Sequence, residues 1–378
     1  MENLNSEKKD QPFKLNTLSK WMIGLAFFFI ILSFTAPYLL TEYSILDLSD
    51  KGTIGDALGG TMNPFIAIGG IFLTYLAFYM QFEANKIQRS QFETQLDESK
   101  KQFKDELQQQ QLEFNKSQFE NQFYEMLKFH KENVNDISIT LINENYAIEV
   151  KISGRETFKY YLEEMKILYM LCKKHCPNYS VDRVMNISYG LFFQGVLDDK
   201  KINYNNKIDD CIIDFYNAIT EINDELKKEN FKNSKKIIDN FLNYKPSINL
   251  EYLLGENHSF NLAHYYRHLY QTVKHVASQK ENFISYNEKR KYLRILRAQL
   301  SNQEQAMLFY NWKSEFGKNW EAKNRFFTDY RMIHNLNNDL LVSDFDLKKI
   351  FNLDKEELYR CEEGKETDSI FEFQDWQS

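Results

Sequence analysis

Two long uncharged stretches near the start of the chain are the clearest pattern of apolar positions in the sequence. Residues 21–41 carry no charge, and neither do residues 57–82. As helices rising about 1.5 Å per residue, both are long enough to cross the ~30 Å hydrocarbon layer of a lipid bilayer. A cleaved signal sequence is the competing interpretation of the first stretch, but a second span follows it directly. We therefore predict a two-helix transmembrane hairpin with spans at 21–41 and 58–82.

Basic residues on either side of these spans predict their orientation. Four lysines lie in the N-terminal tail, 1–20, and five Lys or Arg residues follow the second span between 86 and 104. The connecting segment 42–57 holds one lysine among several acidic residues. Because cytoplasmic segments carry the excess of Lys and Arg, we expect both termini in the cytoplasm and 42–57 as a short extracytoplasmic loop.

Small and polar residues gather in and just before the second span. Gly55 and Gly59 have the four-residue spacing that lets two helix backbones approach closely, and an Asn-Pro pair is expected to interrupt or kink the helix. Two interpretations stay open, which are packing of the hairpin against itself and an oligomerisation face or pore-lining kink. The candidate membrane and oligomerisation residues are Gly55, Gly59, Gly60, Asn63, Pro64, Gly69 and Gly70.

An eleven-residue repeat of apolar positions follows the second span, in a stretch, 83–130, that contains no Gly or Pro. Eleven residues in three turns is about 3.67 per turn, which predicts a helical stalk with a nearly straight, coiled-coil-like association. Because the apolar stripe is narrow, the stalk must pair with another chain or fold back on its own domain, and we favour a homo-oligomer. The stripe consists of Phe92, Leu96, Phe103, Leu107 and Phe114.

Wider apolar faces after the stalk predict a cytoplasmic all-α domain over 131–345, followed by an acidic C-terminal segment, 346–378. The fold class is therefore mostly α. Residues 133–154 are expected to be a loop or irregular, and 362–378 to be a flexible tail or a short docking motif. The predicted helices of the domain are 158–176, 181–197, 206–228, 231–243, 259–279, 286–300, 302–315 and 320–336.

Composition narrows the class of protein further. Only 13 Gly and 5 Pro occur in 378 residues, which excludes turn-rich β sandwiches and enzymes built on Gly-rich nucleotide loops. The net charge of −7 argues against direct nucleic-acid binding by the whole chain, because phosphate would be repelled. Four cysteines without paired spacing do not indicate a disulfide framework.

Motifs for metal or catalytic chemistry are weak. Cys172, His175 and Cys176 share one helical face, but Cys211 and Cys361 are isolated in the sequence, so we expect no metal site and no cofactor. We find no Walker loop, dinucleotide fingerprint, nucleophile elbow or metalloprotease motif. The catalytic residues are unknown, and an enzyme is not the favoured interpretation.

The segment 262–277 (LAHYYRHLYQTVKHVA) combines a buried stripe with a polar face. As a helix, it buries Tyr266, Leu269, Val273 and Val276. His264 and His268 have the spacing of a metal pair, but Arg267 would repel a cation. A His/Arg face suits an anion or a carboxylate-bearing partner, although an internal hydrogen-bond network is the common alternative. The polar flank consists of His264, Arg267, His268, Gln271, Lys274 and His275.

Residues 289–312 carry two stripes and a helix-start signal. The leucine stripe is Leu293, Leu296 and Leu300, and the arginine stripe is Arg290, Arg294 and Arg297. Ser301 and Glu304 form a capping box, which predicts a sharp corner between two helices. We expect the arginines to pair with acids such as Glu304 or Glu315, or to bind phosphate.

Four segments of the chain resemble one family, the AbiC-like phage abortive infection proteins. They are GTIGDALGGTMNPF (52–65), QFENQFYEMLKFHKENV (118–134), HYYRHLYQTVKHV (264–276) and LRAQLSNQEQAMLFYNW (296–312). The resemblance implies a bacterial inner-membrane protein that halts phage production by stopping growth of the infected cell. With His268 and Arg294 from the stripes above, the candidate functional face is His264, Tyr266, Arg267, His268, Tyr270, Arg294, Arg297, Gln299, Ser301, Glu304, Tyr310 and Asn311.

These patterns lead to one favoured hypothesis and two alternatives. In the favoured one, the cytoplasmic domain of a membrane-anchored oligomer senses infection through an unidentified phage or host protein. The first alternative is a membrane-tethered, divergent ribonuclease of the helical HEPN type, motivated by His264, Arg267 and His268. The second alternative is a membrane scaffold that clusters a partner protein.

Overall fold

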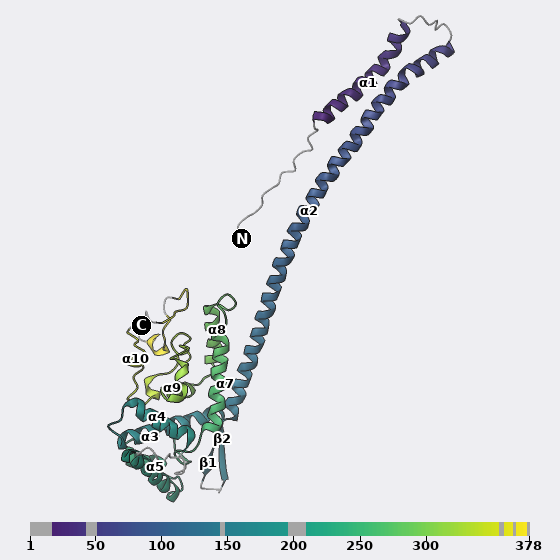
Figure 1. Cartoon of the computed structure of the whole chain (residues 1–378). Helices are drawn as coiled ribbons and strands as arrows, with labels where there is room; N and C mark the ends of the chain where they lie inside the picture. Colours follow the sequence, from purple (N-terminus) through teal and green to yellow (C-terminus); the bar gives the residue numbers. More distant parts are fainter. Residues whose placement is uncertain are drawn as a thin grey trace. The chain divides into compact units, whose positions relative to one another are not determined.

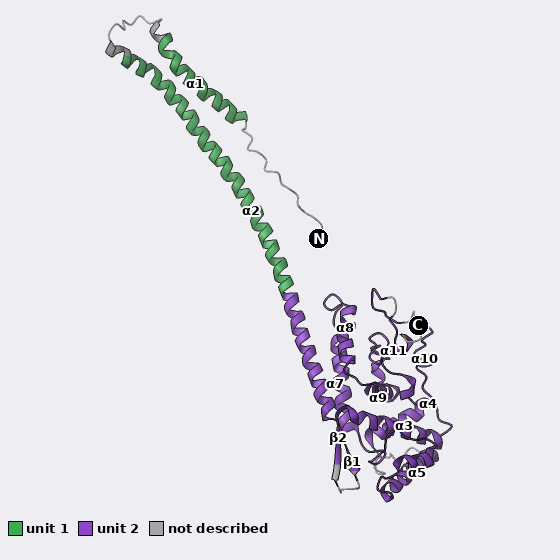
Figure 2. Cartoon of the chain, turned by 180° about the vertical axis from the view of Figure 1, so that it is seen from behind, with its two compact units in different colours: residues 1–110 green, residues 111–378 purple. Residues whose placement is uncertain are grey.

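The computed structural model describes residues 17–42, 51–143, 148–195, 209–354, 359–365 and 368–375. They are mostly helical and form two compact units, residues 1–110 and 111–378, with the boundary inside helix α2 (Figure 2). The main elements, shown in Figure 1, are α1 (Thr17–Glu42), α2 (Lys51–Asp136), β1 (Ser138–Asn143), β2 (Ile148–Ser153), α3 (Thr157–His175), α4 (Val181–Gln194), α5 (Asp210–Lys228), α6 (Ser234–Leu242), α7 (Ser259–Ala277), α8 (Tyr286–Arg297), α9 (Asn302–Lys313), α10 (Leu347–Ile350) and α11 (Glu372–Asp375). Three 3-10 helices complete them: η1 (Gly154–Glu156), η2 (Glu315–Trp320) and η3 (Asn338–Leu340).

Helices α1 and α2 contain the two apolar stretches of the sequence. Thr17–Leu39 and a window within Gly55–Asp136 are long and apolar enough to cross a membrane. Helix α2 is continuous through Pro64, so of the two effects expected there, an interruption and a kink, the interruption does not occur. One missing backbone N–H is tolerated in an apolar helix when the freed carbonyl finds other partners. Part of the expected loop 42–57 is also helical, since α2 begins at Lys51, and residues 43–50 lie outside the described residues.

One glycine packs α1 against α2. A Cβ atom added to Gly69 would lie 3.3 Å from Ile30 Cγ1 and 3.5 Å from the carbonyl oxygen of Ala26, and Phe29 stacks on Phe72 nearby. Packing of the two helices against each other therefore explains Gly69. It does not explain Gly55, Gly59, Gly60 or Gly70, where an added Cβ would meet nothing within 4 Å.

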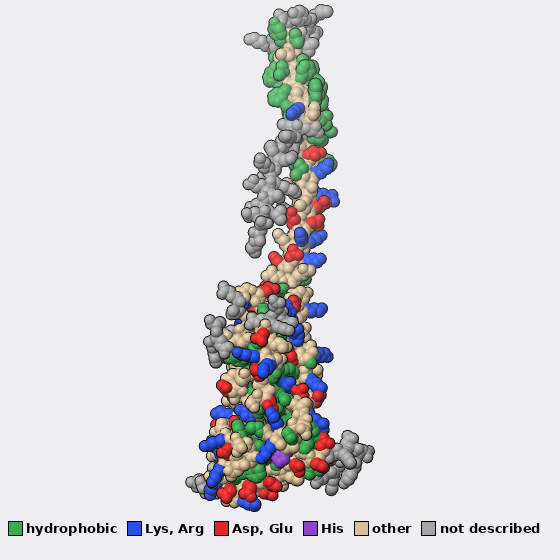
Figure 3. Space-filling model, turned by 90° about the vertical axis from the view of Figure 1, so that its left-hand side faces the viewer, with side chains coloured by type: hydrophobic (Ala, Val, Ile, Leu, Met, Phe, Trp, Pro, Cys, Tyr) green, Lys and Arg blue, Asp and Glu red, His purple; other side chains and the backbone are tan. Residues whose placement is uncertain are grey.

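Apolar side chains of the first unit lie on its surface. Trp21 is 71% exposed and Phe34 is 70% exposed, and Figure 3 shows hydrophobic side chains over α1 and the start of α2. The stalk stripe is also exposed within this single chain. Its members Phe92, Leu96, Phe103, Leu107 and Phe114 are each at least 43% exposed.

The second unit has a continuous hydrophobic core around α3. Phe158, Met165 and Leu168 of this helix are fully buried, and α3 packs against α4, α5 and α9. The helices expected at 158–176, 181–197, 206–228, 231–243, 259–279, 286–300 and 302–315 are confirmed with shifted ends, although 196–197 and 206–208 lie outside the described residues. The predicted corner at Ser301 is also confirmed, because Ser301 Oγ accepts from the Glu304 N–H at 3.2 Å and Glu304 Oε2 accepts from the Ser301 N–H at 2.7 Å.

Two predictions for this unit are wrong. The segment expected to be irregular at 133–154 contains the end of α2 and an antiparallel hairpin of β1 and β2, so the domain is not purely helical. The helix expected at 320–336 is replaced by η2 and turns with positive φ at Arg325 and Arg331. The Glu321 carboxylate accepts from the backbone N–H groups of Phe327 and Thr328, which satisfies donors that a helix would otherwise pair.

The described part of the C-terminal segment packs on its own domain. Ile370 and Phe371 are buried, and Asp368 accepts a bidentate pair of hydrogen bonds from Arg290 at 2.7 and 2.8 Å. The stretch 362–378, expected to be a flexible tail or a short docking motif, thus makes contacts within its own domain at Glu362, Asp368, Ile370 and Phe371. The remaining residues of this stretch, 366–367 and 376–378, lie outside the described residues.

Candidate functional site

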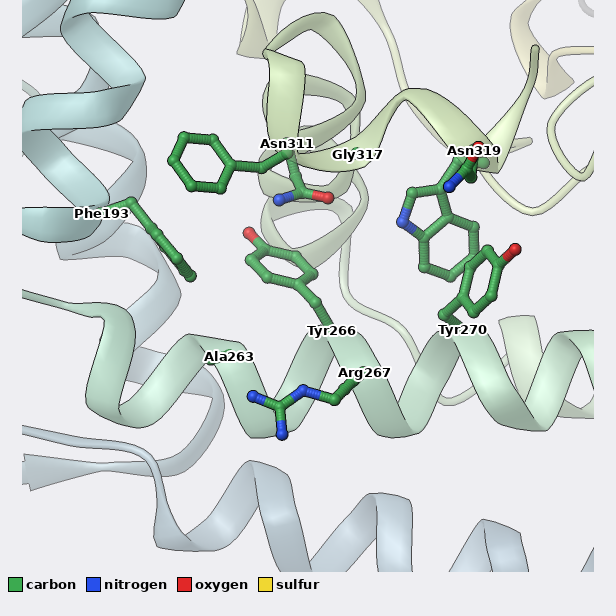
Figure 4. Close-up of a pocket in the computed structure, with 10 residues that line it drawn as sticks. Phe193, Ala263, Tyr266, Arg267, Tyr270, Asn311, Gly317 and Asn319 are labelled. Carbon is green, nitrogen blue, oxygen red and sulfur yellow. The ribbon is translucent and has the colours of Figure 1, made fainter. Parts of the chain in front are cut away.

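A cavity of about 340 Å³ lies beside α7 in the second unit (Figure 4). Its walls come from α4, α7, the end of α9 and η2. Four of the twelve residues predicted for the functional face, Tyr266, Arg267, Tyr270 and Asn311, lie together here. We call this cavity the aromatic pocket, and its lining residues are Phe193, Ala263, Tyr266, Arg267, Tyr270, Asn311, Phe316, Gly317, Asn319 and Trp320.

Helical spacing and one glycine build the aromatic pocket. Ala263, Tyr266, Arg267 and Tyr270 stand at i, i+3, i+4 and i+7, so they share one face of α7. On the opposite wall, an added Cβ at Gly317 would lie 2.4 Å from both the backbone and side-chain oxygens of Asn311. Only glycine allows η2 to fold back this closely onto the end of α9.

Hydrogen bonds fix the tyrosines and the buried amide around the pocket. The Tyr266 hydroxyl donates to the Met307 carbonyl at 3.2 Å, and Asn311 Nδ2 donates to the Tyr189 hydroxyl at 2.8 Å. Burial raises the pKa of Tyr266 well above its ordinary value, so the ring stays neutral. The Tyr270 hydroxyl accepts from Asn324 at 2.8 Å, and its ring lies edge-on to Trp320 (Figure 4). The tyrosines therefore present ring surfaces to the cavity while their hydroxyls bind elsewhere.

Arg267 is the charged side chain that lines the pocket. It is exposed, and it has no hydrogen-bond or ion-pair partner within the described part of the chain. Neighbouring His264 is exposed as well, but it does not line the cavity. The site thus combines aromatic surfaces with an available guanidinium, an arrangement suited to binding a small ligand.

The histidines of α7 face another way. His268 contacts the rings of Phe129 and His130 on α2, and His275 stacks on Phe119 with ring centroids 5.1 Å apart. Burial lowers the pKa of His130 to about 4, with smaller contributions from His268 and Arg155. The polar flank predicted from the sequence is therefore divided: His264 and Arg267 are exposed, whereas His268 and His275 are partly buried against α2.

Glu304 and its neighbours form a separate buried cluster. The Glu304 carboxylate accepts from the Tyr265 hydroxyl at 3.2 Å and lies 3.6 Å from Arg155 Nε. Arg155 also donates to the carbonyl of Gln299. Burial raises the pKa of Glu304, although bonds from Ser301 and the charge of Arg155 oppose this. Ser301, Glu304 and Gln299 hold the corner between α8 and α9, and they do not line the pocket.

The arginines of α8 were expected to pair with acids such as Glu304 or Glu315, but two of them pair with other carboxylates. Arg290 binds Asp368, and Arg294 binds Glu362 at 2.6 Å, so their partners come from the C-terminal segment. Arg297 donates to the carbonyl of Arg331, and burial beside the other arginines lowers its pKa to about 10. Tyr310 is fully buried, and its hydroxyl accepts from the Val342 N–H. None of these four residues lines the pocket.

Cys211 is not isolated in the folded chain, contrary to the expectation from sequence. It lies close enough to Cys176 and Cys172 for the three thiols to influence one another's pKa. Burial raises the pKa of Cys172 to about 11, so this thiol is protonated at neutral pH. Among the described residues, no group of three or more His, Cys, Asp or Glu is arranged to hold a metal ion.

Sequence reasoning missed most of the pocket's aromatic wall. Phe193 lies in the helix predicted at 181–197. Phe316 and Asn319 lie between the helices predicted at 302–315 and 320–336, and Trp320 lies at the start of the second. The pair Phe316-Gly317 after a helix end was the available signal for a tight turn. A second capping box, Ser285 with Glu288, was also readable from its spacing.

Comparison with known proteins links this region to one family. Residues 257–340 match the family model described as "putative phage abortive infection protein". The match confirms the family resemblance, and it contains the segments 264–276 and 296–312 on which that resemblance partly rests. It associates the region with phage abortive infection. No curated protein and no solved structure matches the chain.

Proposed function

We propose that this chain is a membrane-anchored abortive-infection protein whose second unit responds to infection through the aromatic pocket. In this proposal α1 and the first part of α2 cross the bacterial inner membrane, and both termini lie in the cytoplasm. The response halts growth of the infected cell before phage production is complete. The pocket acts as the receiving site for a trigger.

The membrane part of the proposal is supported by apolar side chains that are exposed in this single chain. Trp21, Phe34 and Phe78 are each more than 65% exposed, in helices without charges over the length of a span. Leaving such side chains in water costs about 1.5–3 kcal/mol each, which a lipid environment would remove. The excess of Lys and Arg outside the connecting segment supports the orientation.

Self-association through α2 is the second part of the proposal. Phe92, Phe103 and Phe114 repeat every eleven residues and are each at least 57% exposed. Identical chains held in one membrane would bring identical stripes together in parallel. We therefore propose a homo-oligomer in which the stripes pack on one another, without assigning the number of chains.

One observation carries the assignment of the pocket as the receiving site. The segment that matches the abortive-infection family, 257–340, supplies nine of the ten residues that line the aromatic pocket, all except Phe193. The alternative of a ribonuclease has no comparable support. Its candidate residues diverge, since Arg267 lines the pocket while His268 packs on His130 of α2.

A matched pair of substitutions tests the proposal in cells challenged with phage. Ala263→Trp fills the pocket from its α7 wall, whereas His264→Trp places the same side chain at the neighbouring exposed position. We expect the wild-type chain and His264→Trp to reduce plaque formation equally, and Ala263→Trp to lose the protection. Membrane sedimentation of all three proteins after lysis without detergent checks that each is anchored and expressed.

Two outcomes would contradict the proposal separately. Full protection by Ala263→Trp would remove the pocket from the mechanism. Recovery of the wild-type chain in the supernatant after sedimentation would remove the membrane anchor, whatever the plaque counts show.

A further inference from the structure

We infer that the aromatic pocket binds a mononucleotide, with the base between its aromatic walls and the phosphate on Arg267. The inference rests on the proposed role of the pocket as the receiving site, and it names the chemical class of the ligand. Aromatic surface, side-chain amides and one available guanidinium meet in a cavity of about 340 Å³. A cavity of this size holds a single small ligand.

The walls favour a flat ring. Phe193 comes from α4 and Tyr266 from α7 (Figure 4). Trp320 of η2 lines the same cavity, so rings from three elements border one space. Because the Tyr266 hydroxyl is engaged by the Met307 carbonyl, its ring offers an apolar face. Stacking of a base on an aromatic side chain contributes about 1–3 kcal/mol to binding, whichever of the bases it is.

Amide groups in the wall favour a heteroaromatic ring over a hydrocarbon one. Asn311 is buried, and Nδ2 is committed to the Tyr189 hydroxyl, which leaves Oδ1 to accept. The exposed side-chain amide of Asn319 has no partner within the described residues and offers both donor and acceptor. Such groups match the mixed donors and acceptors on the edge of a nucleobase.

Charge around the pocket favours an anion. Helix α7 carries Arg267 and Lys274 and contains no Asp or Glu, in a chain whose net charge is −7. The guanidinium of Arg267 is exposed and unpaired among the described residues, so it is free to bind two phosphate oxygens at once. A polynucleotide is disfavoured, because its many phosphates would meet the acidic remainder of the chain.

Equilibrium binding to the full chain in detergent micelles tests the inference. The probes are AMP, GMP, CMP and UMP, with the corresponding nucleosides, inorganic phosphate and the amino acids Phe and Trp as comparison ligands. We expect at least one mononucleotide to bind, its nucleoside to bind about tenfold or more weakly, and phosphate alone to show no measurable binding. Tight binding of Phe or Trp with no mononucleotide bound would overturn the assignment of ligand class.

Variants on α7 locate the binding. Arg267→Ala should weaken the mononucleotide about tenfold or more and leave the nucleoside unchanged, and Ala263→Trp should abolish both. Lys274→Ala removes a second exposed cation of the same helix, one that does not line the pocket, and should change affinity less than twofold. Equal weakening by Arg267→Ala and Lys274→Ala would overturn the site, because it would show a general charge effect. Thermal unfolding verifies that each variant is folded.

The two proposals fail in different ways. Absence of any mononucleotide binding, together with loss of protection in Ala263→Trp, would overturn the ligand class and leave the receiving site standing. Mononucleotide binding that needs Arg267, together with full protection by Arg267→Ala, would support the ligand class and overturn the proposed function.

Discussion

The two units of the chain treat the same kind of side chain in opposite ways. Phe34 in α1 is 70% exposed, whereas Phe158 in α3 is fully buried. Both lie in helices, and both are large aromatic hydrocarbons. The difference lies in their neighbours, because α3 packs against α4, α5 and α9, whereas the contacts seen for α1 among the described residues are with α2. A large apolar side chain is therefore expected to be removed from water in either unit. The length of the uncharged stretch predicts whether lipid or protein surrounds it.

Helix α2 contains this contrast within one element. Phe78 and Phe103 are each 67% exposed, while Phe123 is completely buried in the second unit. The helix is continuous from Lys51 to Asp136, so these differences in exposure do not come from a change in backbone conformation. Phe123 lies in the core of the second unit, and the proposed function would place lipid around Phe78 and another copy of the chain around Phe103.

The largest expected effect is on stability, and it tests the contrast between Phe158 and Phe34. Phe158→Ala should lower the free energy of unfolding of the second unit by about 3–5 kcal/mol, since it empties space in a closed core. Phe34→Ala should leave the unfolding of this unit unchanged. Thermal or chemical unfolding of the full chain in detergent measures both variants. Similar losses from the two substitutions would show that α1 contributes to the core of the second unit.

A second prediction concerns the pH dependence where α2 enters the core. Burial lowers the pKa of His130 from 6.5 to about 4, so the folded chain keeps this imidazole neutral while the unfolded chain protonates it. Above pH 6.5 the imidazole is neutral in both states and does not lower stability. As the pH falls from 6.5 towards 4, protonation of the unfolded chain lowers the free energy of unfolding, by about 3 kcal/mol in total. His130→Phe should remove this part of the acid destabilisation, as measured by denaturant unfolding at pH 7 and pH 4.5.

His264→Phe is the matched control for this experiment, because His264 is exposed on α7. It should retain the acid destabilisation of the wild-type chain. Unchanged pH dependence in His130→Phe would mean that this histidine is hydrated or protonated in the folded state. His268 and His275, whose pKa values burial also lowers, would then be the groups to substitute next.

The smallest expected effect concerns the packing of α1 against α2 in the first unit. Gly69→Leu forces a side chain against Ile30 of α1 and should cost about 1–3 kcal/mol in the packing of the two helices. Gly70→Leu adds the same side chain where an added Cβ meets nothing within 4 Å, so it should leave this packing intact. Disulfide cross-linking between cysteines introduced on α1 and α2 reports the packing. Equal loss of cross-linking in both variants would contradict the assignment of Gly69 as the contact.

Several features of the fold were predictable because they depend on near neighbours in the chain. Apolar periodicity located most helices of the second unit, and the spacing of Ser301 and Glu304 predicted the capping box found there. The hairpin of β1 and β2 was missed, although Ile139 and Leu141 alternate with polar residues as a strand requires. Two short strands without a sheet around them give a weak pattern compared with a helix.

The candidate site was only partly predictable. The polar face of α7 and the residues Tyr266, Arg267, Tyr270 and Asn311 were chosen from the sequence, and four of the twelve candidates do line the pocket. Of the others, His264 is exposed outside the pocket, and the rest lie at the corner at Ser301, in the core or in contacts with neighbouring segments. A helical pattern shows which residues share a face, but it does not show what that face packs against.

The sequence alone determined where apolar stretches lie, where most helices form and where the helix at Asn302 begins, because these properties follow from residues a few positions apart. The tertiary structure decided which rings enclose the pocket and which carboxylates meet the arginines of α8. Phe193 and Trp320 are separated by more than a hundred residues, and Asp368 meets Arg290 across 78 positions. Such contacts depend on how whole helices pack, so no local pattern specifies them.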